Sequence, residues 1–135
     1  MSKLLVQLCA FSGKMIENGK WEVDFPTGLQ QDQTISLNLP IKDPALIRYL
    51  GKQQSMNCVI DKEENGEYMV AVACKILRIR HMLNTVTKTT ESMAVAMPDD
   101  RTCEHVLTYL LTPTKCDPKF ITLVRGMQPV QPPTT

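Results

Sequence analysis

The chain has 135 residues, of which 43% are hydrophobic and 21% are charged, so it has enough apolar side chains for a core and too many for a disordered protein. Its 15 Lys and Arg residues nearly balance its 14 Asp and Glu residues, and the formal net charge is +1. This balance excludes a strongly basic, histone-like protein and an acidic mimic of nucleic acid. The length predicts a single globular domain over residues 1–127, followed by a flexible, Pro-rich tail over residues 128–135.

The five cysteines are widely spaced and form no C-x-x-C pair. We expect them to be reduced thiols, since a disulfide-stapled secreted domain favours an even, clustered set. The first apolar run is too short for a signal peptide, and no stretch approaches the roughly 18 apolar residues of a membrane span. The sequence therefore predicts an intracellular protein, cytoplasmic or nuclear, with no membrane partner.

The first half of the chain reads mainly as strands. Apolar residues 4–11 and the alternating residues 21–25 and 35–39 each have strand character. The Asn18–Gly19 pair predicts a hairpin turn between the first two strands. Asp43 followed by Pro44 predicts the start of a short helix over residues 45–52.

A long strand is expected in the middle of the chain. Residues 56–60 read as a strand, and the Asn65–Gly66 pair predicts a turn into a strand that runs from Tyr68 to Arg80. The apolar positions change from even to odd along this strand, which predicts a bulge near Ile76.

The remaining elements follow a Thr-rich segment. Residues 82–92 lack a core pattern and are expected to form an exposed arm or a weak edge strand, and residues 93–97 a short strand. Asp100 is a candidate N-cap for a helix that Pro113 ends, with one apolar stripe. Residues 120–124 are expected to form a last strand.

The order of elements in residues 3–81, with a helix between the third and fourth strands, resembles an OB-fold. The resemblance implies an α+β, mainly β fold: an OB-like five-stranded barrel over about residues 3–81, with an appended helix and one or two strands. It also implies single-stranded nucleic acid lying across the second and third strands, between the loops at residues 13–20 and 61–66. The glutamates of the second loop oppose this placement, because they repel phosphates: Glu63, Glu64 and Glu67.

The positive charge is concentrated in the middle of the chain. Residues 1–43, 44–90 and 91–135 carry net charges of −1, +3 and −1, and no acidic residue lies between Lys75 and Glu91. Arg78 and Arg80 point to the same side of a strand about 7 Å apart, near the phosphate repeat of a nucleic acid. The alternative interpretation is a solvated, charged strand end that protects a sheet edge.

Aromatic side chains that could stack on bases are scarce. Trp21 is a candidate, although its alternating neighbours favour a place in the core, and Tyr68 follows a turn. The candidate nucleic-acid-binding residues are Lys14, Lys20, Trp21, Tyr68, Lys75, Arg78, Arg80 and Lys88.

Nothing in the sequence indicates catalysis, a metal or a cofactor. Cys103 and His105 are two residues apart on the expected helix, so their side chains diverge by about 200° and do not share a metal. The sequence thus predicts a small, non-enzymatic protein that binds single-stranded DNA or RNA and forms a homo-oligomer for avidity. The alternative is a protein-interaction or assembly module, such as a viral or phage accessory protein or a complex subunit.

Overall fold

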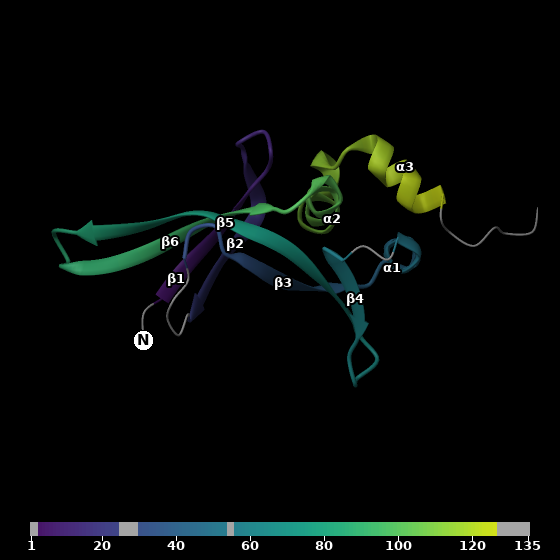
Figure 1. The fold of residues 1–135 in the computed structure, drawn as a ribbon, viewed down its shortest axis with the longest axis horizontal. Helices are drawn as coiled ribbons and strands as arrows, with labels where there is room; N and C mark the ends of the chain where they lie inside the picture. The colour runs from purple at the N-terminus through teal and green to yellow at the C-terminus, as the bar shows by residue number, and fades with distance from the viewer. Residues whose placement is uncertain (1–2, 25–29, 54–55, 127–135) are drawn as a thin grey trace, which may run out of the picture.

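A computed structural model describes residues 3–24, 30–53 and 56–126 of the chain. Within these residues, six strands form one mixed sheet, accompanied by three α-helices and a single 3-10 turn (Figure 1). The strands are β1 (Lys3–Cys9), β2 (Met15–Asp24), β3 (Thr34–Ile41), β4 (Cys58–Lys62), β5 (Tyr68–Asn84) and β6 (Thr89–Pro98). The helices are α1 (Pro44–Gln53), α2 (Arg101–Leu111), η1 (Pro113–Lys115) and α3 (Pro118–Gly126). The α+β, mainly β, barrel-like fold predicted from the sequence is confirmed.

The strands lie in the order β2-β1-β6-β5-β3, and β4 also pairs with β5. All pairs are antiparallel except β1 and β6, which are parallel. The long β5 has β3 along one edge of its first half and β4 along the other, and β6 continues that second edge. The late strand β6 therefore lies between β1 and β5, within the sheet rather than appended to it.

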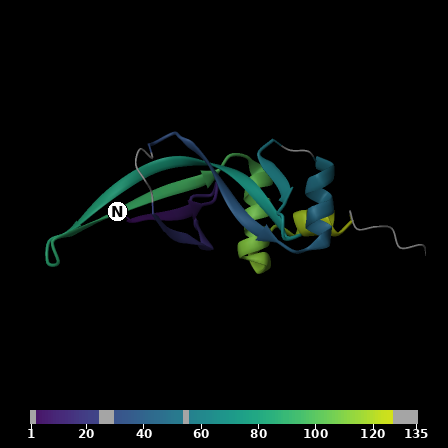
Figure 2. The ribbon, with the colours of Figure 1, turned by 90° about the horizontal axis from the view of Figure 1, so that it is seen from below.

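The sheet is curled, and one of its faces is turned toward the helices (Figure 2). This inner face carries the alternate apolar residues of every strand, such as Val6, Val72 and Ala96, all at most 3% exposed. Helix α2 adds Val106 and Leu107, which are fully buried against the same cluster. Burial of this continuous apolar cluster is the main favourable contribution to folding.

The long β5 changes direction as its pattern predicted. The pairing between β5 and β6 shifts between Ile76 and Arg78, so Leu77 is an extra residue without a partner in β6. The predicted bulge is thereby confirmed, and it reverses which side chains face the core.

The predicted helix starts are also confirmed. The Asp43 carboxylate accepts the Ala45 N–H at 2.9 Å at the start of α1. The Asp100 carboxylate accepts the Cys103 N–H at 2.8 Å at the start of α2. Each carboxylate satisfies a backbone donor that the first helical turn leaves without a partner.

The last predicted strand, residues 120–124, is wrong, because these residues belong to α3. Asp117 and Pro118 begin this helix, and the Asp117 carboxylate accepts the Lys119 N–H at 2.9 Å. Phe120 and Val124 lie four residues apart, on one face of the helix, and both are buried. A short apolar run fits both periods, and the Asp-Pro pair before it was the signal for a helix.

One of the two predicted Asn-Gly turns is correct. Gly66, at a φ of +88°, closes the turn between β4 and β5. Asn18 and Gly19 instead lie inside β2, at a shift in its pairing with β1, and the turn between these strands is at residues 10–14 with Gly13 at a φ of +89°. Asn18 keeps the positive φ that the Asn-Gly pair favours, at +62°, but uses it for a bulge rather than a hairpin.

The Thr-rich segment forms the far end of the β5–β6 hairpin, which extends beyond the other strands (Figure 1). Residues 81–91 are all exposed, which confirms the predicted exposed arm. The predicted tail, residues 128–135, lies outside the described residues, and the single domain over residues 1–127 stays a prediction. No helix among the described residues has the length and apolarity needed to cross a membrane.

Candidate nucleic-acid interface

The side of the sheet that faces away from the helices carries the basic residues of β5. We call this side of β2, β1, β6 and β5 the outer face. Side chains alternate between the two faces of a strand, and directly paired residues of neighbouring strands point to the same face. The residues of the outer face are therefore those that alternate with the inner-face residues and pair with one another across the strands. They include Lys20, Glu22, Leu5, Gln7, Met93, Val95, Met97, Lys75, Arg78 and Arg80, and farther along the hairpin Met82 and Glu91.

The bulge at Leu77 brings the two arginines to the outer face. Ile76 is fully buried, so strict alternation would turn the other even positions, Arg78 and Arg80, toward the core as well. The extra residue reverses the alternation, and both arginines are exposed while Ile79 packs against the core. The same strand therefore supplies core residues in its first half and cations in its second.

Lys20 joins the arginines although it lies on a different edge of the sheet. Lys20 pairs with Gln7, Gln7 with Val95, and Val95 with Arg78, so these four residues form one row across four strands. At about 4.8 Å between neighbouring strands, Lys20 and Arg78 stand about 14 Å apart. The neighbouring row through Arg80 ends on Glu22. The negative charge of Glu22 repels phosphates, so this row is less favourable for a phosphate backbone than the row through Arg78.

The cations of the outer face are open to solvent. Lys75 forms an exposed ion pair with Asp32, whose carboxylate lies 3.8 Å from the Lys75 ammonium. Within the described part of the chain, Lys20, Arg78 and Arg80 have no acidic group within 4.0 Å. Their charges are available to an anionic ligand, and surface pairs such as that of Lys75 are easily exchanged.

The acidic turn that opposed nucleic-acid binding lies far from this face. Glu63, Glu64 and Glu67 belong to the turn before β5, whereas the arginines lie in its second half. At about 3.3 Å per residue, Glu67 and Arg78 are about 35 Å apart along the strand. At physiological salt this separation exceeds the screening length of about 8 Å several times.

The groove expected across the second and third strands is wrong, because these two strands are not adjacent in the sheet. Strands β2 and β3 lie at opposite edges of the sheet, because β1, β6 and β5 lie between them. Phe25, at the end of the expected groove, lies outside the described residues.

The other candidate residues are dispersed. Trp21 lies on the inner face, half-buried against the core, as its alternating neighbours favoured. Tyr68 begins β5, with the Lys62 ammonium 5.8 Å from its ring centroid. Lys14 is exposed beside the β1–β2 turn, and Lys88 is exposed in the turn of the arm at a φ of +58°.

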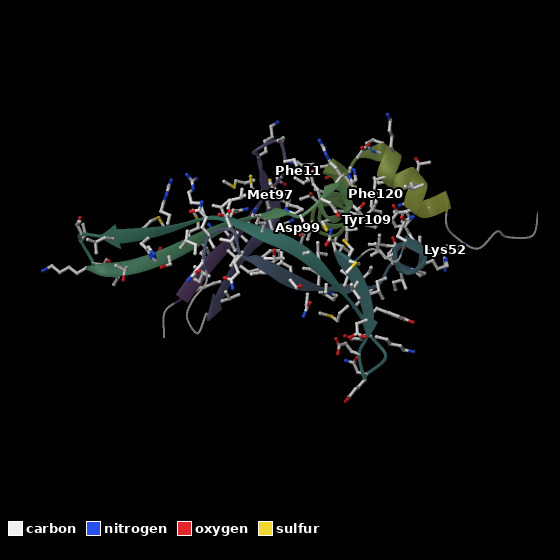
Figure 3. All side chains as sticks on the ribbon, in the orientation of Figure 1. Phe11, Lys52, Met97, Asp99, Tyr109 and Phe120 are labelled. Carbon is white, nitrogen blue, oxygen red and sulfur yellow. The ribbon has the colours of Figure 1, made fainter. Side chains whose placement is uncertain are left out.

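The centre of the outer face is apolar, which sequence reasoning missed. Val95 is buried and Leu5, Met93 and Met97 are half-buried between the cationic strands, and Figure 3 labels Met97. The pairing of β1 with β6 brings these residues together, and no local signal reveals a parallel pairing between distant segments. Methionine side chains adapt their shape to a partner, so this centre suits a face of a base as well as a protein side chain.

The cysteines lie in the core rather than at a site. All five are buried and free, and the sulfurs of Cys58 and Cys103 are 3.4 Å apart. The hydrogen bond with Cys103, together with burial, raises the pKa of the Cys58 thiol, and burial raises the pKa of Cys74 to about 12. Among the described residues, no group of three or more His, Cys, Asp or Glu side chains is placed to hold a metal ion.

Comparison of the chain with protein-family models, with curated proteins and with solved structures found no match.

Proposed function

We propose that this protein binds single-stranded nucleic acid, DNA or RNA, through the outer face. The observation that carries the proposal is the row that joins Lys20 to Arg78, with Arg80 and Lys75 beside it on β5. Cations on two strands of one sheet can contact separate phosphates of a nucleic-acid strand that crosses the sheet, and guanidinium planes also stack on bases. The modest charge of the whole chain agrees with a local contact of few phosphates rather than a wrapped duplex.

Association of several copies is part of the proposal. Within the described residues, β2 and β3 each have one neighbour in the sheet, which leaves one edge of each strand without a partner. Such edges accept a further strand, and joined copies on one nucleic-acid strand would bind with avidity. A cytoplasmic or nuclear location is likewise proposed, on the basis of five free thiols.

Binding of a fluorescent oligonucleotide, measured by anisotropy at several salt concentrations, tests the proposal. We expect salt-dependent binding, which the double variant Arg78→Gln/Arg80→Gln weakens. Loss of two phosphate contacts should reduce the slope of log K against log salt by about 1.4. The matched control is Lys52→Gln/Lys119→Gln, which removes the same charge from exposed positions on α1 and α3.

Two results would contradict the proposal. One is the absence of binding to either DNA or RNA at about 50 mM salt, where electrostatic contacts are strong. The other is an equal loss of affinity in the arginine variant and in its control, because a non-specific effect of net charge does not depend on position.

A second function is favoured by the apolar tip of the arm. Leu83 and Val86 are 67% and 88% exposed and lie three residues apart at the tip of the arm, where the surface of another protein can cover both. This observation supports a protein-interaction or assembly module. A stable complex with another protein that survives nuclease treatment, and that Leu83→Ser/Val86→Ser abolishes, would favour the second function over the first.

A further inference from the structure

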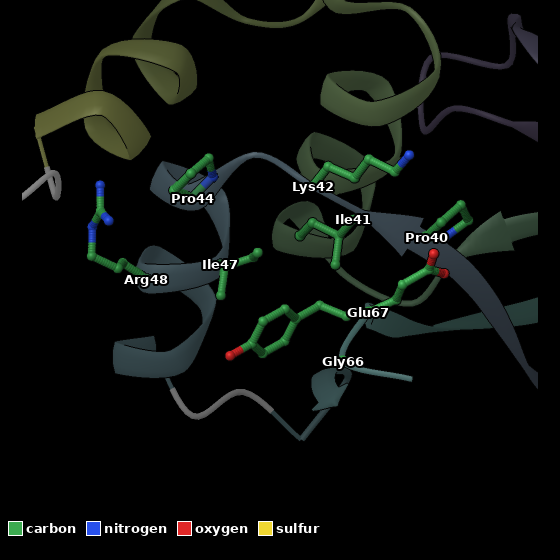
Figure 4. A pocket seen from close by; sticks show the side chains of 9 residues that line it. Pro40, Ile41, Lys42, Pro44, Ile47, Arg48, Gly66 and Glu67 are labelled. Carbon is green, nitrogen blue, oxygen red and sulfur yellow. The ribbon is translucent and has the colours of Figure 1, made fainter. Parts of the chain in front are cut away.

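A cavity of about 490 Å³ lies at the end of β5 that is remote from the arginines. It is a half-open cavity bordered by the end of β3, the first turns of α1 and the start of β5 (Figure 4). Its volume is in the range of sites that hold small molecules or short peptide segments. No step of the proposed nucleic-acid contact uses this cavity.

The walls of the cavity are largely apolar, and its charged side chains are Lys42, Arg48 and Glu67. Pro40, Pro44, Ile47 and the ring of Tyr68 supply the apolar surface. Arg48 stands at one side, and its Nε is buried without a hydrogen-bond partner in the described part of the chain. A buried donor without a partner is costly, so the site favours an apolar occupant that brings hydrogen-bond acceptors.

Residues 128–133 of the same chain have this chemistry. They read Gln-Pro-Val-Gln-Pro-Pro and contain no charge. Prolines lack the backbone N–H but keep the carbonyl, so the segment is rich in acceptors and poor in donors. Proline-rich segments in the polyproline II conformation typically bind to grooves lined by aromatic side chains, because little conformational entropy is lost.

Helix α3, which precedes this segment in the chain, packs on α1, whose first turns line the cavity. Helix α3 packs on α1 through the rings of Phe120 and Tyr49, whose centroids are 5.5 Å apart. The Tyr109 hydroxyl donates a hydrogen bond to Asp43, and the cation of Arg125 acts on the same hydroxyl.

Asp43 lies in the chain between Lys42 and Pro44, which both line the cavity. Arg125 precedes Gly126, which is the last residue of α3. In the polyproline II conformation residues 127–133 span about 20 Å, at about 3.1 Å per residue. That length exceeds the diameter of a helix with its side chains, about 10–12 Å, so the segment can pass from α3 across α1.

We propose that residues 128–133 of this chain bind in the cavity between α1 and β5, with Pro side chains against Tyr68 and Ile47 and a backbone carbonyl accepting the Nε–H of Arg48. The contact is intramolecular, since the short connection keeps the segment at a high effective concentration. It is independent of nucleic-acid binding, and each proposal can fail without the other.

Nuclear magnetic resonance of the full chain labelled with nitrogen-15 tests this proposal. The backbone amides of Val130 and Gln131 should have the order parameters of a packed segment, near 0.85 rather than below about 0.6. In Pro132→Ala/Pro133→Ala these values should fall, and the amides of Ile47 and Tyr68 should shift. The matched control Thr134→Ala, which lies beyond the Pro-rich run, should change neither.

Changes in the segment leave the core intact, so a negative result is not caused by unfolding. The proposal is overturned if the Val130 amide is mobile in the unaltered chain, or if the double variant leaves the Ile47 and Tyr68 amides unshifted. It is also overturned if dilution by about tenfold releases the segment, because binding to a second copy depends on concentration and intramolecular binding does not.

The cavity side gives a second measurement. Arg48→Met keeps the aliphatic stem of the side chain and removes the donor, so the mobility of Val130 should rise. Lys52→Met, on the last turn of the same helix, is the control and should leave it unchanged. Equal behaviour of the two variants would remove the assigned role of the Arg48 donor.

Discussion

Lys20 and Arg78 lie on one row of the outer face, joined by Gln7 and Val95 of the two intervening strands. The pairing of β1 with β6 is what aligns them, because each cation belongs to a different hairpin. A ligand that crosses the strands meets both Lys20 and Arg78, whereas a ligand that follows β5 alone does not meet Lys20.

The contribution of Lys20 therefore reports the path of the nucleic acid. We expect Lys20→Gln to weaken oligonucleotide binding and to reduce the salt slope by about 0.7, the effect of one phosphate contact on a single strand. Titrations of anisotropy against salt measure this, with Lys119→Gln as the control. An unchanged slope in Lys20→Gln would exclude a path across the row.

Two glycines should respond to alanine with opposite signs. A Cβ on Gly19 would lie 3.0 Å from the Ile16 carbonyl oxygen and 3.1 Å from the Leu8 Cβ, and Leu8 is fully buried. Because the two nearest atoms are a backbone oxygen and the Cβ of a fully buried residue, neither of which is the end of a flexible side chain, we expect Gly19→Ala to lower the free energy of unfolding by about 1–3 kcal/mol.

Gly51 is the glycine at which alanine should have the opposite effect, and it lies in a helix. Nothing lies within 4 Å of a Cβ built there, and the residue is inside α1. Gly51→Ala should raise the free energy of unfolding by about 0.5–1 kcal/mol through helix propensity. Urea unfolding measures both variants, and destabilisation by Gly51→Ala would contradict the helical position.

The Asp100 carboxyl should make stability depend on acid pH. Burial raises the pKa of this group, but hydrogen bonds from Asn57, at 2.7 Å, and from the Cys103 N–H outweigh it and hold the pKa below its usual range. A folded pKa below the unfolded value means that this stabilisation is present above about pH 4 and is lost as the pH falls through the folded pKa.

Asp100→Asn should remove this part of the pH dependence. Urea midpoints measured at neutral pH and at about pH 3 compare the variant with the unaltered chain. Asp99→Asn, at the adjacent exposed carboxylate, is the control and should retain the dependence. If both variants lose it equally, hydrogen bonding at the start of α2 is not its source.

The cysteines should be unreactive in the folded protein. Burial covers all five thiols, and raised pKa values keep Cys58 and Cys74 protonated at neutral pH, whereas the thiolate is the reactive form. A thiol-specific reagent should therefore label the chain slowly under native conditions and all five positions after unfolding. Mass spectrometry counts the labels, and rapid labelling of Cys58 or Cys103 in the native state would contradict their burial.

Local signals in the sequence predicted those elements that depend on a few neighbouring residues. Asp43 and Asp100 mark helix starts because their carboxylates satisfy backbone donors nearby. The change of parity beyond Ile76 predicted the bulge, since core contact requires apolar residues on one face. The strand predicted over residues 120–124 is wrong because a short run with four apolar residues fits either period, and the Asp-Pro pair before it is the signal that distinguishes a helix.

The candidate site likewise has one part that local signals in the sequence predict and another part that they do not. The two-residue spacing of Arg78 and Arg80 places them on one side of any strand, and this could be predicted. The position of Lys20 beside them follows from the pairing of β1 with β6, which no local pattern encodes. The chemistry of Trp21 makes it a candidate for stacking, but the alternation of its neighbours favours the core, and it lies half-buried on the inner face.

The place of β6 in the sheet also affects how the chain folds. β1 leaves the ribosome first, and one of its two neighbours, β6, emerges only after β2 to β5. Contacts between distant segments slow folding, because the intervening chain must be closed into a loop before they form. Until β6 arrives, the apolar residues of β1 and β5 are open to other chains, and nascent protein is most prone to aggregate in this interval.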